Sequence, residues 1–145
     1  DVMPPQYISE SATVQTSIIS EGAEIYGHVE HSVIGPGVII HANAEVRDSI
    51  IMNDVIVRDG AIIEKAIIAE ECDIGSHAQI GIGEEIENAL EPRIYGGGIV
   101  TIGERTTIPS CVKIGKNTVI SGKTIYEDYQ DGALMSGQSL IREVG

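Results

Sequence analysis

Five of the nine basic residues lie between positions 93 and 123, and their side chains are of the types that bind anions. They are Arg93, Arg105, Lys113, Lys116 and Lys123. Glu104 is the only acid among them, so this segment has a net charge of +4 in a chain whose total is -13. Guanidinium and ammonium groups make charge-assisted hydrogen bonds to phosphates. We expect a contact with an anionic effector or a neighbouring domain; the alternative is a solvated basic face without a ligand.

The histidines and cysteines form no recognisable catalytic or metal motif. His28 and His31 are three residues apart, and no third ligand follows at a spacing typical of zinc. Cys111 has no neighbouring base in the sequence that could activate its thiol. We therefore predict no catalytic residue, no cofactor-binding residue and no metal ligand in this chain.

Composition limits the partners and the compartment. The net charge of -13 and the pI of about 4.5 argue against nucleic acid and anionic membranes as partners. Two cysteines in 145 residues are typical of reduced thiols in a cytoplasmic protein rather than of a disulfide scaffold. No stretch resembles a signal peptide or a membrane span.

These side chains are positioned by a repeat. An aliphatic residue recurs at steps of six, six and five, so that three steps span 17 residues. In the middle of the chain the recurring residues are Ile34, Ile40, Val46, Ile51, Val57, Ile63, Ile68, Ile74 and Ile80. This period fits neither a helix nor a long strand. It fits short strands separated by corners, which build a triangular β-solenoid with three strands in each coil.

Each recurring aliphatic residue is a marker of the repeat. A second set of residues, four positions after each marker, is predicted to point inward as well. Ala44, Ala61 and Ala78 form one column of this set. Ile50 and Ile67 belong to another, and Cys72 is predicted to be a small apolar filler. The step of six also predicts that Arg105 and Lys123, eighteen residues apart, lie one coil apart on one face.

The repeat also predicts how the chain is divided. Residues 1–7, which contain Pro4-Pro5, are expected to be a linker from a missing N-terminal catalytic domain, so the chain would be a piece of a longer protein. Residues 8–145 are expected to form the solenoid, with an acidic loop inserted at 82–98. Residues 124–145 are expected to be a C-terminal cap, in which Tyr126 and Tyr129 seal the last coil.

Several stretches resemble one enzyme family. "PPQYI", "SEGAEIYGHVEHSVIGPGV", "VRDSIIM" and "GAIIEKAII" look like the C-terminal domain of glucose-1-phosphate adenylyltransferases. "YGGGIVTIGERTTIPSCVKI" is similar to the end of plant and some bacterial members. The resemblance implies an all-β fold, a single-stranded left-handed parallel β-helix of hexapeptide repeats. It also implies a non-catalytic domain for oligomerisation and allosteric regulation.

By this resemblance, the full enzyme makes ADP-glucose and pyrophosphate from ATP and glucose 1-phosphate in glycogen or starch synthesis. ATP and Mg²⁺ are expected in the missing catalytic domain, and the protein is expected to be a cytoplasmic homotetramer that responds to a phosphorylated metabolite. Plant-like members hold an anionic activator with lysines at two positions that align here with Gly96 and Glu104. Effector identity therefore does not carry over.

Two other functions stay open from the sequence. Hexapeptide-repeat acyltransferases use acyl-coenzyme A and a histidine as general base, for which His28, His31, His41 and His77 are candidates. The ending "MSGQSLIREVG" differs from the end typical of those enzymes. The chain could also be the β-helix domain of another sugar nucleotidyltransferase.

Overall fold

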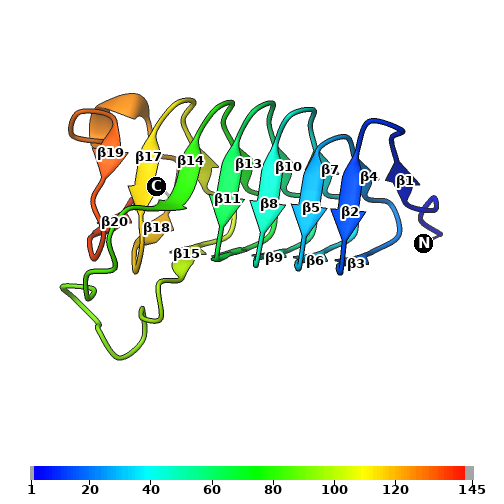
Figure 1. Ribbon diagram of the computed structural model, residues 1–145. Coiled ribbons are helices and arrows are strands. Elements are labelled where there is room, and N and C mark those ends of the chain that lie inside the picture. Colours follow the sequence, from blue (N-terminus) through cyan, green and yellow to red (C-terminus); the bar gives the residue numbers. More distant parts are fainter. Residues whose placement is uncertain (1, 143–145) are drawn as a thin grey trace.

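A computed structural model describes residues 2–142 as a rod built from three parallel sheets (Figure 1). The sheets have six, seven and seven strands and form the three sides of a triangular coil, which confirms the predicted single-stranded parallel β-helix. The N-terminus lies at one end of the rod, and β19 and β20 lie at the other (Figure 1). Within the described residues no helix is long and apolar enough to cross a membrane.

Each coil contributes one short strand to each sheet. Sheet A contains β1 (Tyr7–Ile8), β4 (Glu24–Ile25), β7 (Ile39–Ile40), β10 (Ile56–Val57), β13 (Asp73–Ile74) and β16 (Thr107–Ile108). Sheet B contains β2 (Thr13–Gln15), β5 (His28–Glu30), β8 (Glu45–Arg47), β11 (Ile62–Glu64), β14 (Gln79–Ile82), β17 (Lys113–Gly115) and β19 (Ala133–Leu134). Sheet C contains β3 (Ile18–Ile19), β6 (Val33–Ile34), β9 (Ile50–Ile51), β12 (Ala66–Ile68), β15 (Val100–Ile102), β18 (Val119–Ser121) and β20 (Ser139–Ile141).

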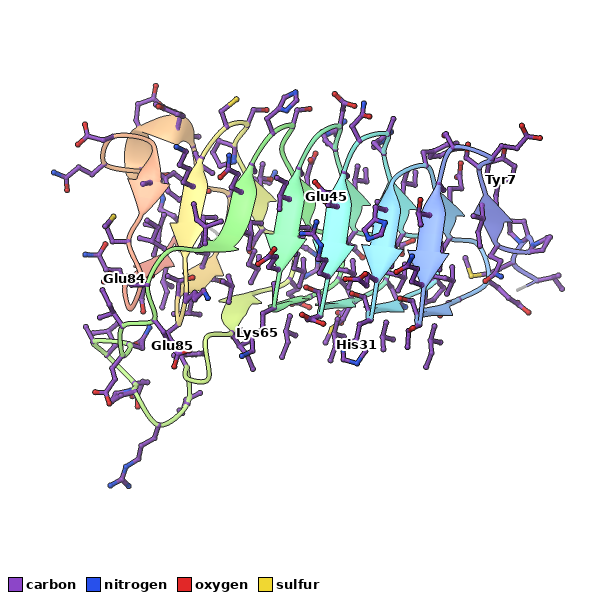
Figure 2. All side chains as sticks on the ribbon, viewed as in Figure 1. Tyr7, His31, Glu45, Lys65, Glu84 and Glu85 are labelled. Carbon is purple, nitrogen blue, oxygen red and sulfur yellow. The ribbon has the colours of Figure 1, made fainter. Side chains whose placement is uncertain are left out.

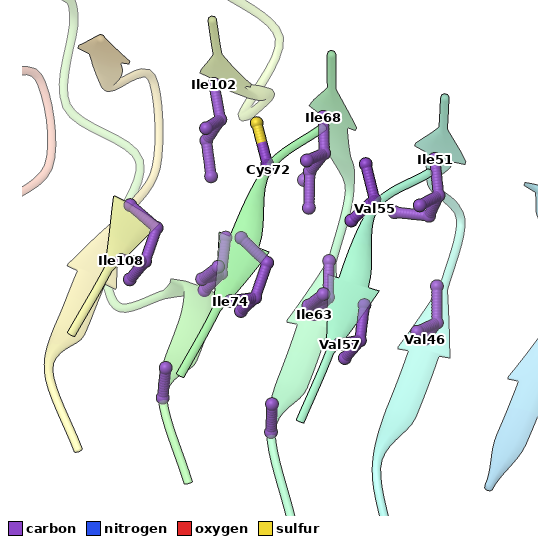
Figure 3. Packing of buried hydrophobic residues seen from close by; sticks show 14 of the residues in the cluster. Val46, Ile51, Val55, Val57, Ile63, Ile68, Cys72, Ile74, Ile102 and Ile108 are labelled. Atoms are coloured by element: carbon purple, nitrogen blue, oxygen red, sulfur yellow. The ribbon is translucent and has the colours of Figure 1, made fainter. Parts of the chain in front are cut away.

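The core consists of side chains stacked in register (Figure 3). Ile51 pairs with Ile68, seventeen residues later, and both are fully buried. Ala44, Ala61 and Ala78 are also fully buried, and the residue after each of them pairs with its counterpart in the next coil. The predicted alanine column is therefore confirmed. Branched aliphatic side chains suit this interior because they fit a pleated surface with few rotamers.

The loop after β14 interrupts the coil without breaking the stack. Ile68 in β12 is aligned with Ile102 in β15, although 34 residues separate them instead of 17. The extra residues lie between β14 and β15 and project sideways from the rod (Figure 1). The insertion therefore has the length of one coil, and the sheets continue beyond it in register.

The chain after Lys123 continues the stack. A 3-10 helix (Tyr126–Asp128) leads to β19 and β20, which pair with β17 and β18. Tyr129 is buried at this end, and its hydroxyl lies 2.8 Å from the hydroxyl of Thr124. Most of the tail that we expected to cover the last coil is thus itself a coil. At the other end β1 begins at Tyr7, the last residue of the predicted linker.

Serine side chains form a ladder of hydrogen bonds at the corner before sheet C. The hydroxyl of Ser49 donates to the carbonyl oxygen of Arg47 at 2.7 Å and accepts the backbone N–H of Ala66 at 3.1 Å. Ser32 accepts the N–H of Ser49 at 3.1 Å, and Ser17 accepts the N–H of Ser32 at 3.0 Å. The recurring serine thus satisfies buried backbone groups that the sheets leave unpaired at this corner.

Ser49→Ala tests this ladder. The substitution leaves the buried N–H of Ala66 without its acceptor, so we expect the free energy of unfolding to fall by about 1–3 kcal/mol. Urea denaturation followed by circular dichroism measures the change. Ser110→Ala is the matched control, because Ser110 is an exposed corner serine, and we expect it to change stability by less than about 0.5 kcal/mol. Equal losses in the two variants would contradict the role of the ladder.

Candidate interaction surface

A column of aliphatic side chains lies on the outer face of sheet C. Ile18, Val33, Ile50 and Ile67 are aligned in consecutive coils. Ile18 is 67% exposed and Ile50 is 43% exposed. We call these four residues the aliphatic ladder. Adjacent exposed apolar side chains on a regular surface are typical of a site that binds a protein partner.

The ladder overturns one prediction from the sequence. Ile50 and Ile67 were expected to point inward, but Ser49 and Ala66 are the buried residues of that pair of coils. Side chains alternate along a strand, and Ile51 and Ile68 already point inward, so their immediate predecessors must point outward. The steps that lead into sheet C, from Val46 to Ile51 and from Ile63 to Ile68, are five residues long instead of six. The second inward position of these corners therefore falls one residue earlier, on Ser49 and Ala66.

The ladder forms the floor of a groove with a polar edge. Thr16, His31, Asp48 and Lys65 line this edge in consecutive coils, and all four are corner residues with positive φ. His31 Nδ1 lies 2.7 Å from Asp48 Oδ1, and both side chains are well exposed. Figure 2 shows His31 and Lys65 along the same side of the rod. Ile99, at the end of the inserted loop, also lines the groove.

The inserted loop covers the remainder of the same face. Val119 occupies the outward column in β18 that continues the ladder, yet it is only 7% exposed. Buried Asn88 fixes the loop there by donating to the carbonyl oxygen of Asn117 at 2.9 Å. Asn117 in turn donates to the carbonyl oxygen of Ile86 at 3.0 Å. The outward column of sheet C is therefore aliphatic and exposed in its N-terminal coils, whereas farther along it contains Thr101, Val119 and Ser139, of which Val119 is buried.

The five basic residues of the predicted anion site lie on separate parts of the fold. Arg93 is in the inserted loop, Arg105 in the corner before β16, and Lys113 on β17 of sheet B. Lys116 follows β17, and Lys123 pairs with Thr107 on sheet A. The structure does not bring all five into one site, and their role in binding an effector stays a prediction.

The predicted stacking of Arg105 over Lys123 is wrong. Lys123 forms an isolated β-bridge with Thr107 and is therefore aligned with that residue. The chain reaches this bridge fewer than six residues after β18, so the expected spacing of six does not apply here. Arg105 also has other partners, since its guanidinium lies 3.4 Å from Glu71 and 3.2 Å from Glu104. Of the five basic residues, Arg105 is the one that forms ion pairs with side chains of residues 2–142.

The four candidate histidines are spread over three coils, with His28 and His31 in the same coil. His28 is on β5, whereas His41 and His77 are corner residues on another edge of the rod. His77 lies 3.7 Å from Asp59, and His31 has the closer carboxylate in Asp48. Among residues 2–142 no three histidine, cysteine or acidic side chains are arranged to hold a metal ion.

The two thiols have opposite environments, which gives a prediction. Cys72 is buried, and burial raises the pKa of its thiol to about 11, whereas Cys111 is exposed. Since the thiolate is the reactive form, we expect only Cys111 to react rapidly with an aromatic disulfide at pH 8. Cys111→Ser should remove the rapid phase, and both thiols should react in denaturant. A rapid phase that persists in Cys111→Ser would contradict the assignment of Cys72 to the core.

The fold defines a hexapeptide-repeat β-solenoid, and its sheet C has a column of partly exposed aliphatic side chains. Residues 5–102 match the model of a protein family described as "GlmU-like, C-terminal hexapeptide". The chain belongs to this family of C-terminal hexapeptide domains.

Named relatives extend the comparison. The chain is 49% identical over 142 residues to the glucose-1-phosphate adenylyltransferase of Lachnospira eligens, covering 98% of this chain and 34% of that enzyme. It is 39% identical over 141 residues to the enzyme of the same name from Acetivibrio thermocellus, covering 97% of this chain and 33% of that enzyme. The chain spans about a third of the length of these curated relatives.

Solved structures share the fold. The acetyltransferase domain of PglB from Neisseria gonorrhoeae superposes with a TM-score of 0.54 at 18% identity, over 99% of this chain and 52% of that one. Its complex with acetyl coenzyme A gives a TM-score of 0.50 at the same identity, over 97% of this chain and 56% of that one. At this identity the likeness concerns the β-solenoid alone, and it gives acyl transfer no further support.

Proposed function

We propose that this chain is the non-catalytic assembly and regulatory domain of a glucose-1-phosphate adenylyltransferase. In this proposal the whole protein is a cytoplasmic homotetramer that converts ATP and glucose 1-phosphate into ADP-glucose and pyrophosphate. Support comes from identities of 39% and 49% to enzymes of that name along nearly the whole chain. ATP, Mg²⁺ and the sugar phosphate bind to the other two thirds of the protein.

The aliphatic ladder carries this proposal. Ile18, Val33 and Ile50 are exposed in a row, although the equivalent outward positions of sheet B hold mostly polar residues such as Thr13 and His28. Burying such a row against another domain contributes about 25 cal/mol for each Å² of apolar surface removed from water. The partner that we propose is the catalytic part of the same protein, because the relatives are about three times as long as this chain.

Basic residues of segment 93–123 are proposed to contact an anionic metabolite effector or the catalytic part. Lys113 and Lys123 are exposed and have no ion pair to a described side chain, so their charges are available to an anion. Arg105 is the weakest candidate because Glu71 and Glu104 already neutralise it. A response of the full-length enzyme to phosphorylated sugars that is unchanged in Lys113→Ala and Lys123→Ala variants would remove this part of the proposal.

Pyrophosphate release tests the proposed function. The full-length protein is incubated with Mg²⁺, ATP and glucose 1-phosphate, with this chain alone as the matched sample. We expect pyrophosphate and ADP-glucose from the full-length protein and none from the isolated chain. A full-length protein that is folded but forms no ADP-glucose would overturn the assignment of substrates, and activity of the isolated chain would overturn its non-catalytic role.

A further inference from the structure

The aliphatic ladder has the same chemistry in every coil, so it does not by itself fix where a partner sits along the rod. Its four residues occupy equivalent positions, and consecutive coils are about 4.8 Å apart. A partner displaced by one coil would keep most of these apolar contacts. A catalytic part that docks on sheet C therefore needs other contacts, which differ from coil to coil.

The polar edge of the groove is a feature that does change from coil to coil. Its residues are Thr16, His31, Asp48 and Lys65, with a hydroxyl, an imidazole, a carboxylate and an ammonium group. All four have φ between 46° and 52°, a region that favours glycine or asparagine. At the other edge of sheet C, the corresponding row begins with Gly22 and Gly37. The chain therefore keeps polar side chains along the groove in spite of the backbone strain.

Asp48 and Lys65 lie in adjacent coils and have opposite charges, yet they do not pair with each other. Asp48 Oδ1 lies 2.7 Å from His31 Nδ1 in the preceding coil, and both side chains are more than half exposed. One residue earlier in the same two coils, Arg47 Nη1 donates to Glu64 Oε1 at 3.0 Å. Adjacent coils can thus form an ion pair at this corner, but the two charges that line the groove stay separate.

Glu85 of the inserted loop adds a second acid beside Lys65. A Cβ atom on Gly98 would lie 3.0 Å from Glu85 Oε1 and 3.6 Å from Lys65 Nζ, so the two charged groups flank Gly98. Figure 2 shows Glu85 and Lys65 on the same side of the rod. The charges along this edge therefore alternate, from negative at Asp48 to positive at Lys65 and negative at Glu85.

We propose that this order of charges fixes the position of the catalytic part on the aliphatic ladder, with a basic side chain of that part beside Asp48 and an acidic one beside Lys65. The charges of Asp48 and Lys65 cancel, so their order determines the position and their sum does not. A slip by one coil would set like charges against each other, which opposes association.

The inference rests on the docking proposed above and adds what makes that docking specific. The occupant is the remainder of the same protein, since this chain spans about a third of the length of its relatives. Apolar contacts with the ladder provide the attraction in this account, and the polar edge selects one position among several equivalent ones.

Exchanging the two charges tests their order without altering composition or net charge. The double variant Asp48→Lys, Lys65→Asp is made in the full-length protein, with Ile50→Cys as reporter in a Cys111→Ser background. The rate of thiol labelling at position 50 is measured by mass spectrometry in this protein and in the matching isolated chain. We expect docking to slow labelling about tenfold or more with the original order and less than about threefold with the exchanged order.

Asp59 provides the matched control for a single charge reversal. It lies at the corner between sheets A and B, and its carboxylate is 3.7 Å from His77, much as Asp48 lies beside His31. Asp48→Lys should speed labelling at position 50 of the full-length protein, whereas Asp59→Lys should leave it unchanged. Circular dichroism of each isolated chain checks that the solenoid is folded.

The outcomes separate this inference from the proposed function. Slow labelling that persists in the exchanged variant would reject the charge order and leave docking intact, and an equal effect of Asp59→Lys would also reject it. Equally fast labelling of the full-length protein and the isolated chain, both with the original order, would exclude docking on sheet C and the inference with it. Pyrophosphate formation is measured on the same samples. Slow labelling that depends on the charge order, in a protein that forms no ADP-glucose, would reject the proposed function and retain the inference.

Discussion

Ile63→Ala is expected to lower the free energy of unfolding by about 2–5 kcal/mol, the range typical of a large aliphatic side chain removed from a rigid core. Ile63 is fully buried in β11, aligned with Val46 on one side and Ile80 on the other. The coils are held apart at the spacing of hydrogen-bonded strands, so neighbouring side chains cannot close the space that alanine leaves. Urea denaturation at constant pH measures the loss.

Ile62→Ala provides the control within the same strand. Ile62 points outward and is half-buried, so we expect its replacement to cost less than about 1 kcal/mol. The two variants remove the same atoms from adjacent positions. The difference between their unfolding free energies therefore isolates the contribution of the stacked interior side chains. Similar losses of stability in both variants would show that the two faces of sheet B are equally packed. That result would contradict a triangular coil whose core consists of the inward side chains alone.

Ile50→Lys in the full-length protein is expected to reduce pyrophosphate formation about tenfold or more, because it places a charge at the centre of the proposed interface with the catalytic part. Ile50 is 43% exposed in the solenoid, so the isolated chain should tolerate the lysine with a change in unfolding free energy of less than about 1 kcal/mol. Activity assays and circular dichroism of the two preparations separate the effects.

Ile56→Lys is the matched control for the ladder. Ile56 is also an outward isoleucine of a two-residue strand, but it lies on sheet A between Ile39 and Asp73. We expect this variant to retain nearly full activity. Equal inhibition by both lysines would mean that sheet C has no special part in docking, and full activity of Ile50→Lys would exclude the ladder from the interface.

The architecture could be predicted from spacing alone because the repeat fixes two quantities. Steps of six, six and five residues define three sides of a coil, and the recurrence of alanine at positions 44, 61 and 78 defines the width of the interior. In a solenoid each coil contacts only its neighbours, so a local rule applies along the whole rod. The structure adds the register, in which equivalent residues of successive coils are aligned within each sheet.

The outward ladder was missed because the second inward position was counted with a fixed offset. The signal was present: the residue before each marker of sheet C is aliphatic in four consecutive coils, whereas on sheets A and B that position varies between apolar and polar residues. Alternation along a strand would have placed Ile50 and Ile67 outside. The fixed offset of four residues ignored that the step into sheet C is five residues long instead of six.

Contacts of the inserted loop could not be predicted from the repeat. The loop has no period, and its position depends on Asn88 and Asn117, which are 29 residues apart and meet only in the folded chain. Single residues that join distant segments leave no pattern in the sequence.

Thiol labelling at position 50 tests most directly whether the aliphatic ladder is covered in the whole protein. In a Cys111→Ser background, Ile50→Cys is labelled in the isolated chain and in the full-length protein, with Glu127→Cys as the exposed control. We expect the cysteine at position 50 to react about tenfold or more slowly in the full-length protein, and the control to react equally in both. Equal labelling rates at position 50 would contradict docking on sheet C.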